Sequence, residues 1–186
     1  MASQQELTHE RNERFLALLR PVYTDCQRWA YSLTQNAEEA EDLFQQSVLI
    51  GLEHVHQLKN EAAFKTWMFR IISNAHRLMI RQRKRQPEPM EQEKLDRAAP
   101  QGGEWVEQQE LRVTVRRLLA RLSPEQRQAL LLFEMHGMSI REVSEVMGKK
   151  ETAVRVLLHR ARQRMAGLLR KEGIETLRPT GEGVGE

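Results

Sequence analysis

Apolar side chains recur along most of this chain at intervals of three and four residues, and Pro, Gly or Asn interrupts the pattern at a few points. Such spacing is typical of amphipathic helices, because it gathers the apolar side chains on one face. No stretch alternates apolar and polar residues as a half-buried strand would. The pattern predicts helices over 10–33 with a kink or restart at Pro21, and over 37–54, 61–85, 105–122, 124–136, 140–147 and 151–169.

The last two of these helices form a distinctive pair. Ser139 can cap a short helix, Gly148 supplies a turn, and a longer helix follows. Its core-facing residues are expected to be Val154, Leu157, Leu158, Ala161, Met165 and Leu168, and its outward residues Thr152, Arg155, Val156, His159, Arg160 and Gln163. A short helix, a tight turn and a second helix with a basic outer face predict a helix-turn-helix, whose second helix enters the major groove of DNA.

Charge supports this interpretation. Residues 139–170 contain eight Lys or Arg and three Glu, whereas the whole chain carries a net charge of +3. Concentrated positive charge suits phosphate binding. A solvated amphipathic helix in a helical bundle would explain the charge alone, but the order of short helix, Gly turn and long helix favours DNA.

A second basic surface is expected on the helix at 61–85. Six basic residues and no acid lie between Arg70 and Arg85, and Trp67 stands near their start. An aromatic ring beside a basic track is typical of proteins that hold single strands. The competing interpretation is that Trp67 belongs to the core.

The chain divides between these two surfaces. Pro87 should end the third helix, and residues 87–110 then hold seven acids against two basic residues. We therefore expect an all-α fold of two small helical lobes, at 10–85 and 106–172, joined by a flexible acidic linker at 86–105 and followed by a flexible tail at 173–186. The motif Ser123-Pro124-Glu125-Gln126 predicts a capped helix start inside the second lobe.

The composition of the chain excludes several classes of function. The single cysteine, Cys26, excludes an internal disulfide and suits a reducing cytoplasm, and we expect neither a secretory segment nor membrane insertion. His54, His56 and His76 match no standard metal spacing. With no phosphate-binding Gly loop or Ser-His-Asp arrangement, we expect no enzyme activity, cofactor, metal or small-molecule substrate.

Four motifs in this order resemble those of the extracytoplasmic-function sigma factors, the small promoter-recognition subunits of bacterial RNA polymerase. In the first lobe these are residues 40–46 (Ala-Glu-Asp-Leu-Phe-Gln-Gln) and 64–74 (Phe-Lys-Thr-Trp-Met-Phe-Arg-Ile-Ile-Ser-Asn). In the second they are 122–127 (Leu-Ser-Pro-Glu-Gln-Arg) and 158–162 (Leu-His-Arg-Ala-Arg). The resemblance covers about residues 14–85 and 106–170. It implies that the lobes are sigma region two and sigma region four.

The resemblance implies a role for each surface. The helix at 37–54 would bind the β′ clamp of the polymerase core through Asp42, Leu43 and Gln45. The minus-ten element would be opened, and a flipped base held, by Leu58, Lys59, Asn60, Lys65, Trp67, Arg70, Asn74 and Arg77. The helix-turn-helix, about residues 139–158, would read the minus-thirty-five element through Lys149, Lys150, Thr152, Arg155, Val156, His159 and Arg160. In this family the linker threads toward the polymerase active centre.

Two departures from the family pattern affect these roles. Gln46 and Ser47 stand where Glu and Thr are usual, which removes a charge from the core-binding helix. Residues 154–157 are Val-Arg-Val-Leu where Val-Lys-Ser-Arg is common, so contact of Val156 with a thymine methyl would replace a polar base contact.

The expected function is that of an alternative sigma factor that directs polymerase to specific promoters and helps to open them. Its partners would be the polymerase core, through β′ and β, promoter DNA and, by resemblance, an anti-sigma protein. The chief alternative is an autonomous helix-turn-helix regulator, which leaves the 40–46 motif and the basic track after Arg70 without a role. An adaptor that binds only proteins would leave both basic surfaces unused.

Overall fold

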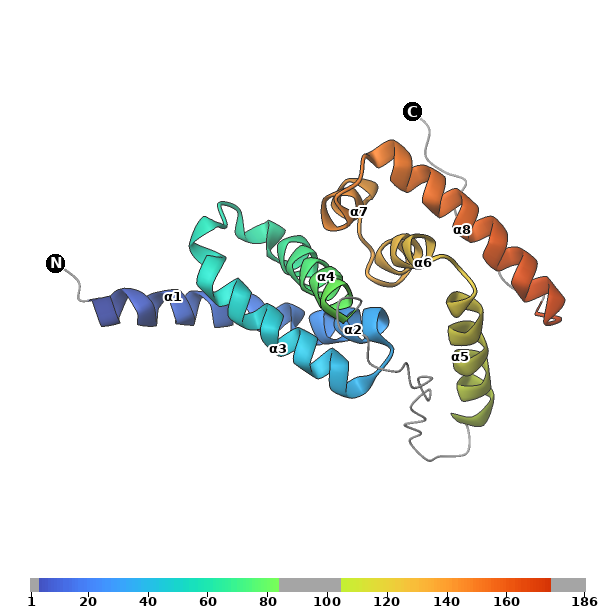
Figure 1. Cartoon of the computed structure of the whole chain (residues 1–186), viewed down its shortest axis with the longest axis horizontal. Coiled ribbons are helices and arrows are strands. Elements are labelled where there is room, and N and C mark those ends of the chain that lie inside the picture. The colour runs from blue at the N-terminus through green and yellow to red at the C-terminus, as the bar shows by residue number, and fades with distance from the viewer. Residues whose placement is uncertain (1–3, 84–104, 175–186) are drawn as a thin grey trace. The chain divides into compact units, whose positions relative to one another are not determined.

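The computed structural model describes residues 4–83 and 105–174, and throughout these ranges the regular structure is helical (Figure 1). The all-α expectation is thus confirmed. Residues 86–104 of the expected linker and 175–186 of the expected tail lie outside the described ranges. Within the described part, contacts define two compact units, one holding α1 to α4 and residues 141–149, the other holding α5, α6 and α8.

The first unit follows the predicted helices, except that its first helix begins at Gln4, whereas the sequence pattern predicted a start near residue 10. It contains α1 (Gln4–Leu19), the 3-10 turn η1 (Arg20–Val22), α2 (Tyr23–Thr34), α3 (Ala37–His54), the 3-10 turns η2 (Val55–Gln57) and η3 (Glu61–Ala63), and α4 (Phe64–Arg83). Pro21 lies in η1, so the chain restarts there as a new helix. Gln35, with a φ of 60°, ends α2, and the Asn36 side chain then accepts a hydrogen bond from the Glu39 N–H to cap α3.

Aromatic and sulfur-containing side chains fill the core of this unit. The rings of Trp29 and Phe69 stack at 5.6 Å with an interplanar angle of 3°. The indole Nε1 of Trp29 donates to the Ser73 hydroxyl over 3.1 Å, so the buried polar atom is satisfied. Cys26 beside them is fully buried. Burial raises the pKa of its thiol to about 12, the Asp25 carboxylate adds to the rise, and Lys65 opposes it.

The second unit is built around α8. It contains α5 (Trp105–Ala120), α6 (Pro124–Leu130), a π-helical turn η4 (Leu131–Met135) and α8 (Glu151–Lys171), while α7 (Ile140–Met147) lies between η4 and α8 in the chain. Ser123 and Gln126 form the expected capping box at the start of α6. Helix α8 packs against α6 and α5. The buried apolar side chains of this unit are Leu118, Leu122, Ala129, Leu131, Leu132, Met138, Val154, Leu158, Ala161 and Leu169.

One part of the predicted core of α8 is wrong. Val154, Leu158 and Ala161 are buried as expected, but Leu157, Met165 and Leu168 are half-exposed and Leu169 is buried instead. The helical spacing alone takes no account of the chain that follows α8. In the structure the chain turns back at Gly173, with a φ of 74°, and the Ile174 N–H donates to the Leu169 carbonyl over 3.1 Å.

None of the helices in the described ranges combines the length and the apolar composition that crossing a bilayer requires.

Candidate nucleic-acid interface

The outward face of α4 carries a row of polar and aromatic side chains. Arg70, Asn74 and Arg77 are exposed and Trp67 is half-exposed. Their spacing of three, four and three residues places them along one side of the helix. The Arg77 Nε donates to the Ser73 carbonyl over 3.3 Å. These four of the eight residues predicted for the minus-ten element therefore lie together on one surface, and Arg81 extends its charge in the last turn.

Trp67 combines the two interpretations that its sequence left open. Its ring lies 5.7 Å from that of Phe64 at an angle of 43°, so one side is packed against the unit. The rest of the side chain is accessible. A ring held in this way is preorganised to stack on an unpaired base.

Lys65 differs from its neighbours on α4. Its Nζ pairs with the Asp25 carboxylate at 2.8 Å and lies 5.8 Å from the centre of the Phe69 ring. The side chain is about one-third exposed. Lys65 therefore links α4 to α2. The DNA contact predicted for Lys65 would require its side chain to leave the ion pair with Asp25.

The loop before α4 is fastened from α1. Arg14 pairs with Glu61 at 2.8 Å and its Nη2 donates to the Leu58 carbonyl over 3.4 Å. The Leu58 side chain is only 8% exposed, whereas Lys59 and Asn60 are exposed. Lys59 and Asn60 can thus meet a ligand directly, while Leu58 packs inward and sets the path of the loop.

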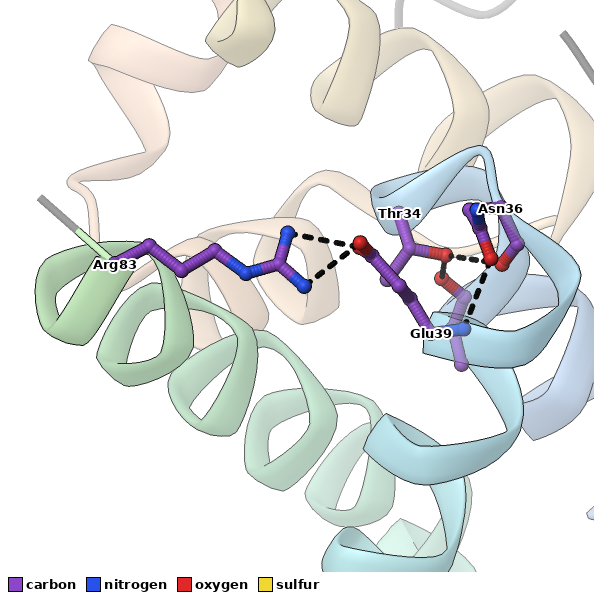
Figure 2. Close-up of polar contacts among 5 residues, drawn as sticks. Thr34, Asn36, Glu39 and Arg83 are labelled. Atoms are coloured by element: carbon purple, nitrogen blue, oxygen red, sulfur yellow. Dashed lines mark hydrogen bonds and ion pairs between the residues drawn. The ribbon is translucent and has the colours of Figure 1, made fainter. Parts of the chain in front are cut away.

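The far end of α4 is fastened to the turn between α2 and α3 (Figure 2). Arg83 makes a two-pronged ion pair with Glu39, at 2.7 and 3.0 Å. The Thr34 hydroxyl lies 3.2 Å from the Ala30 carbonyl and 3.0 Å from that of Asn36, which stabilises the turn that presents Glu39. This clasp fixes the direction of the last turn of α4.

His76 lies one-tenth exposed on the inner side of α4. Desolvation by burial lowers the pKa of its imidazole below the ordinary value of 6.5, Arg83 and Arg77 lower it further, and Glu39 acts in the opposite direction. The group is therefore a neutral core histidine at neutral pH. Within the described ranges no three His, Cys, Asp or Glu side chains gather as a metal site would require.

The helix α3 presents a mixed surface. Asp42 and Gln45 are exposed, and the Gln45 amide donates to Glu41 over 2.9 Å. Leu43 is 1% exposed and belongs to the core. Sequence reasoning missed Leu49, which is 63% exposed seven residues after Asp42 and so extends the same side of α3.

The predicted recognition helix α8 has the expected outward face. Thr152, Arg155, Val156, His159 and Arg160 are all exposed. Gly148, with a φ of 64°, makes the turn before α8, where an L side chain would be strained. Lys149 is half-exposed and Lys150 is exposed at the N-cap position of α8.

Comparison with known proteins bears on both surfaces. The family model for Sigma-70 region 2 matches residues 18–86, and that for Sigma-70, region 4 matches residues 112–165. The ECF RNA polymerase sigma factor SigM of Mycobacterium tuberculosis (strain ATCC 25618 / H37Rv) is 32% identical over 158 residues, which cover 83% of this chain and 76% of SigM. The chain belongs to the ECF RNA polymerase sigma factors.

Other relatives agree. The ECF RNA polymerase sigma factor EcfG of Rhodopseudomonas palustris (strain TIE-1) is 28% identical to this sigma factor, over 81% of this chain and 82% of EcfG. SigE of Mycolicibacterium smegmatis is 30% identical over 80% of this chain, which spans 59% of the length of that relative.

Solved structures show the same fold. The sigma factor RpoE in complex with the anti-sigma factor NepR from Bartonella quintana gives a TM-score of 0.66 at 22% identity, over 85% of this chain and 98% of that chain. CnrH in complex with the cytosolic domain of CnrY gives 0.64 at 22% identity, over 89% of this chain and 96% of that chain.

Proposed function

We propose that this ECF sigma factor is an alternative sigma factor in which α3 binds the polymerase core, α4 with its preceding loop holds the opened minus-ten element, and α8 reads the minus-thirty-five element as duplex. The observation that carries the proposal is that two exposed basic faces, on α4 and on α8, belong to different units. A protein that binds one duplex site through α8 alone would not need the basic face on α4.

The proposed contact with the β′ clamp uses the exposed side of α3. Asp42 and Gln45 supply polar partners, and Leu49 adds an apolar side chain whose burial would favour binding. Leu43 supports this surface from beneath.

The proposed contact with single-stranded DNA uses Lys59 and Asn60 in the loop and Trp67, Arg70, Asn74 and Arg77 on α4. The half-exposed Trp67 ring offers a stacking platform, and the cationic side chains along the helix can follow the phosphates. Flipping a base costs a few kcal/mol, which such stacking can offset.

The proposed duplex contact uses the start of α8. We assign Lys150 and Arg160 to phosphate contacts and Arg155 to a guanine edge. Val156, which is 48% exposed, would contact a thymine methyl. Thr152 and His159 flank these side chains on the same face.

The remaining assignments follow from this mechanism. We assign residues 10–85 to core binding and the minus-ten element, 86–105 to the linker, 106–172 to the minus-thirty-five element and 173–186 to a tail. The factor would work beside the polymerase in the cytoplasm and perform no reaction itself. An anti-sigma protein is a proposed partner, in keeping with the RpoE–NepR and CnrH–CnrY complexes that share its fold.

Run-off transcription with purified core polymerase on genomic fragments, with and without this protein, tests the proposal. We expect new transcripts from a small set of promoters when the protein is added. Tight and specific duplex binding by the protein alone, without an effect on polymerase, would instead support the autonomous regulator.

A further inference from the structure

The first turn and a half of α8 carries one acid among its exposed residues. Glu151, Thr152, Arg155 and Val156 are all exposed, while Val154 is buried. A helix turns about 100° per residue, so these four side chains form one strip along the outer side of α8. Glu151 therefore lies on the surface that is proposed to face DNA.

An acid is unexpected on such a surface, because its charge repels the phosphates. Its place in the first helical turn, where the helix dipole favours a carboxylate, gives a purely structural reason for it. The side chain also makes a contact that the helix dipole does not explain. Its Oε2 lies 3.4 Å from Nη2 of Arg155, one turn along the same strip.

Glu151 and Arg155 together present an acceptor beside a donor. A carboxylate only accepts hydrogen bonds, and in the major groove the bases that donate are cytosine, through N4, and adenine, through N6. Guanine and thymine present acceptors there, which repel a carboxylate. Adenine also places its N7 acceptor beside N6, so cytosine is the better match. The neighbouring guanidinium of Arg155 lowers the free-energy cost of removing water from the carboxylate when α8 enters the groove.

We propose that Glu151 is a specificity-determining residue, which selects a base with an exocyclic amino group, cytosine foremost, at one position of the upstream promoter element. The inference rests on the proposed reading of that element by α8. It assigns Glu151 a role distinct from phosphate binding, which would act equally on all sequences.

The test uses the complete sigma factor with core polymerase on a promoter library whose upstream element is randomised, with sequencing of the bound and transcribed promoters. We compare Glu151→Ala and Glu151→Gln with the natural protein. The matched control is Glu145→Gln on α7, since Glu145 is also exposed and pairs with the Arg four residues away, Arg141, at 3.3 Å. It removes the same charge from a similar pair. Thermal melting followed by circular dichroism checks that each variant folds.

We expect the natural protein to prefer cytosine over guanine and thymine at one position by about tenfold. The Ala variant should lose this preference at that position alone. The Gln variant should shift it toward adenine, because an amide can pair with both N6 and N7. The Glu145→Gln control should keep the preference.

Two results would overturn the inference: no preference for an amino base at any position, or a Glu151→Ala variant whose binding changes by the same factor on every sequence. Arg155→Ala and Val156→Ala separate this failure from that of the proposed function. If they alter base preference and Glu151→Ala does not, only the role of Glu151 fails. If all three variants keep every preference, α8 does not read the element and both proposals fail.

Discussion

Gly51 of α3 lies directly against the ring of Phe15 of α1. A Cβ placed on Gly51 would be 2.8 Å from Phe15 Cε2 and 2.9 Å from the sulfur of Met68 on α4. Real Cβ atoms do not come so close to their neighbours. The missing side chain therefore lets α1, α3 and α4 approach one another at the centre of the first unit.

Gly51→Ala should destabilise the first unit by about 1–3 kcal/mol, because the added methyl overpacks a filled core. Urea unfolding followed by circular dichroism measures the change. Gly167→Ala is the control, since Gly167 lies inside α8 with nothing within 4 Å of an added Cβ. That change should stabilise the protein by about 0.5–1 kcal/mol. Equal effects at both positions would contradict the packing argument.

Stability should fall on mild acidification because of His76. Its folded pKa is lowered below the ordinary 6.5, so the unfolded chain binds a proton more readily than the folded one. The stabilisation is therefore complete above about pH 6.5 and is lost as pH falls through and below that value. Urea unfolding at several pH values between neutrality and pH 5 measures this. In a His76→Gln variant the slope over this range should be smaller, and an unchanged slope would exclude His76 as its cause.

Arg155→Ala should weaken recognition of the minus-thirty-five element by about 1–3 kcal/mol, the range for one good base contact, and leave polymerase binding intact. Arg164→Ala is the control, because Arg164 is also exposed on α8 but lies about 180° around the helix. Holoenzyme binding to promoter duplexes and a pull-down with core polymerase separate the two functions. Equal loss of both in the Arg155 variant would argue against the assignment.

Trp67→Ala should impair promoter opening by about 1–3 kcal/mol through loss of one stacked base. Permanganate reactivity of unpaired thymines reports the opening. Because the ring also packs on Phe64, Trp67→Phe is the companion variant, which keeps an aromatic face. We expect it to restore part of the opening. If both variants open the promoter as the natural protein does, Trp67 serves only the core.

Leu49→Ala should weaken binding to core polymerase by roughly 1–2 kcal/mol without a loss of stability, since the side chain is exposed in the free protein. Leu16→Ala on α1 removes an exposed leucine of similar accessibility and should leave the affinity unchanged. Competition for core polymerase against a labelled sigma factor measures both. Equal affinities for the two variants would remove Leu49 from the interface.

The sequence predicted the helices well where local signals act. The bounds of α3 agree with the expectation because Asn36 caps its start and an apolar face runs its length. The helix expected from residue 61 begins with a 3-10 turn, because the Asn60 side chain accepts from the Ala62 N–H and starts a tighter winding. The π-helical turn after α6 had no sequence signal that we recognised.

The site was predicted less completely, and for a physical reason. Helical spacing places Arg70, Asn74 and Arg77 on one face, which needs no knowledge of the rest of the fold. The ion pairs Arg14–Glu61 and Glu39–Arg83 join residues 47 and 44 positions apart, and no local pattern shows them. A family motif likewise names Leu43 and Leu58 without saying that both point inward.

The buried thiol of Cys26 has a practical consequence for labelling this protein at cysteine. A thiol that stays protonated and out of reach of solvent does not attack alkylating reagents, because the thiolate is the nucleophile. A cysteine engineered at an exposed position could therefore be labelled with a fluorophore in the folded protein while Cys26 is left in place. The natural residue would then record, by its rate of modification, how often the helices around it come apart.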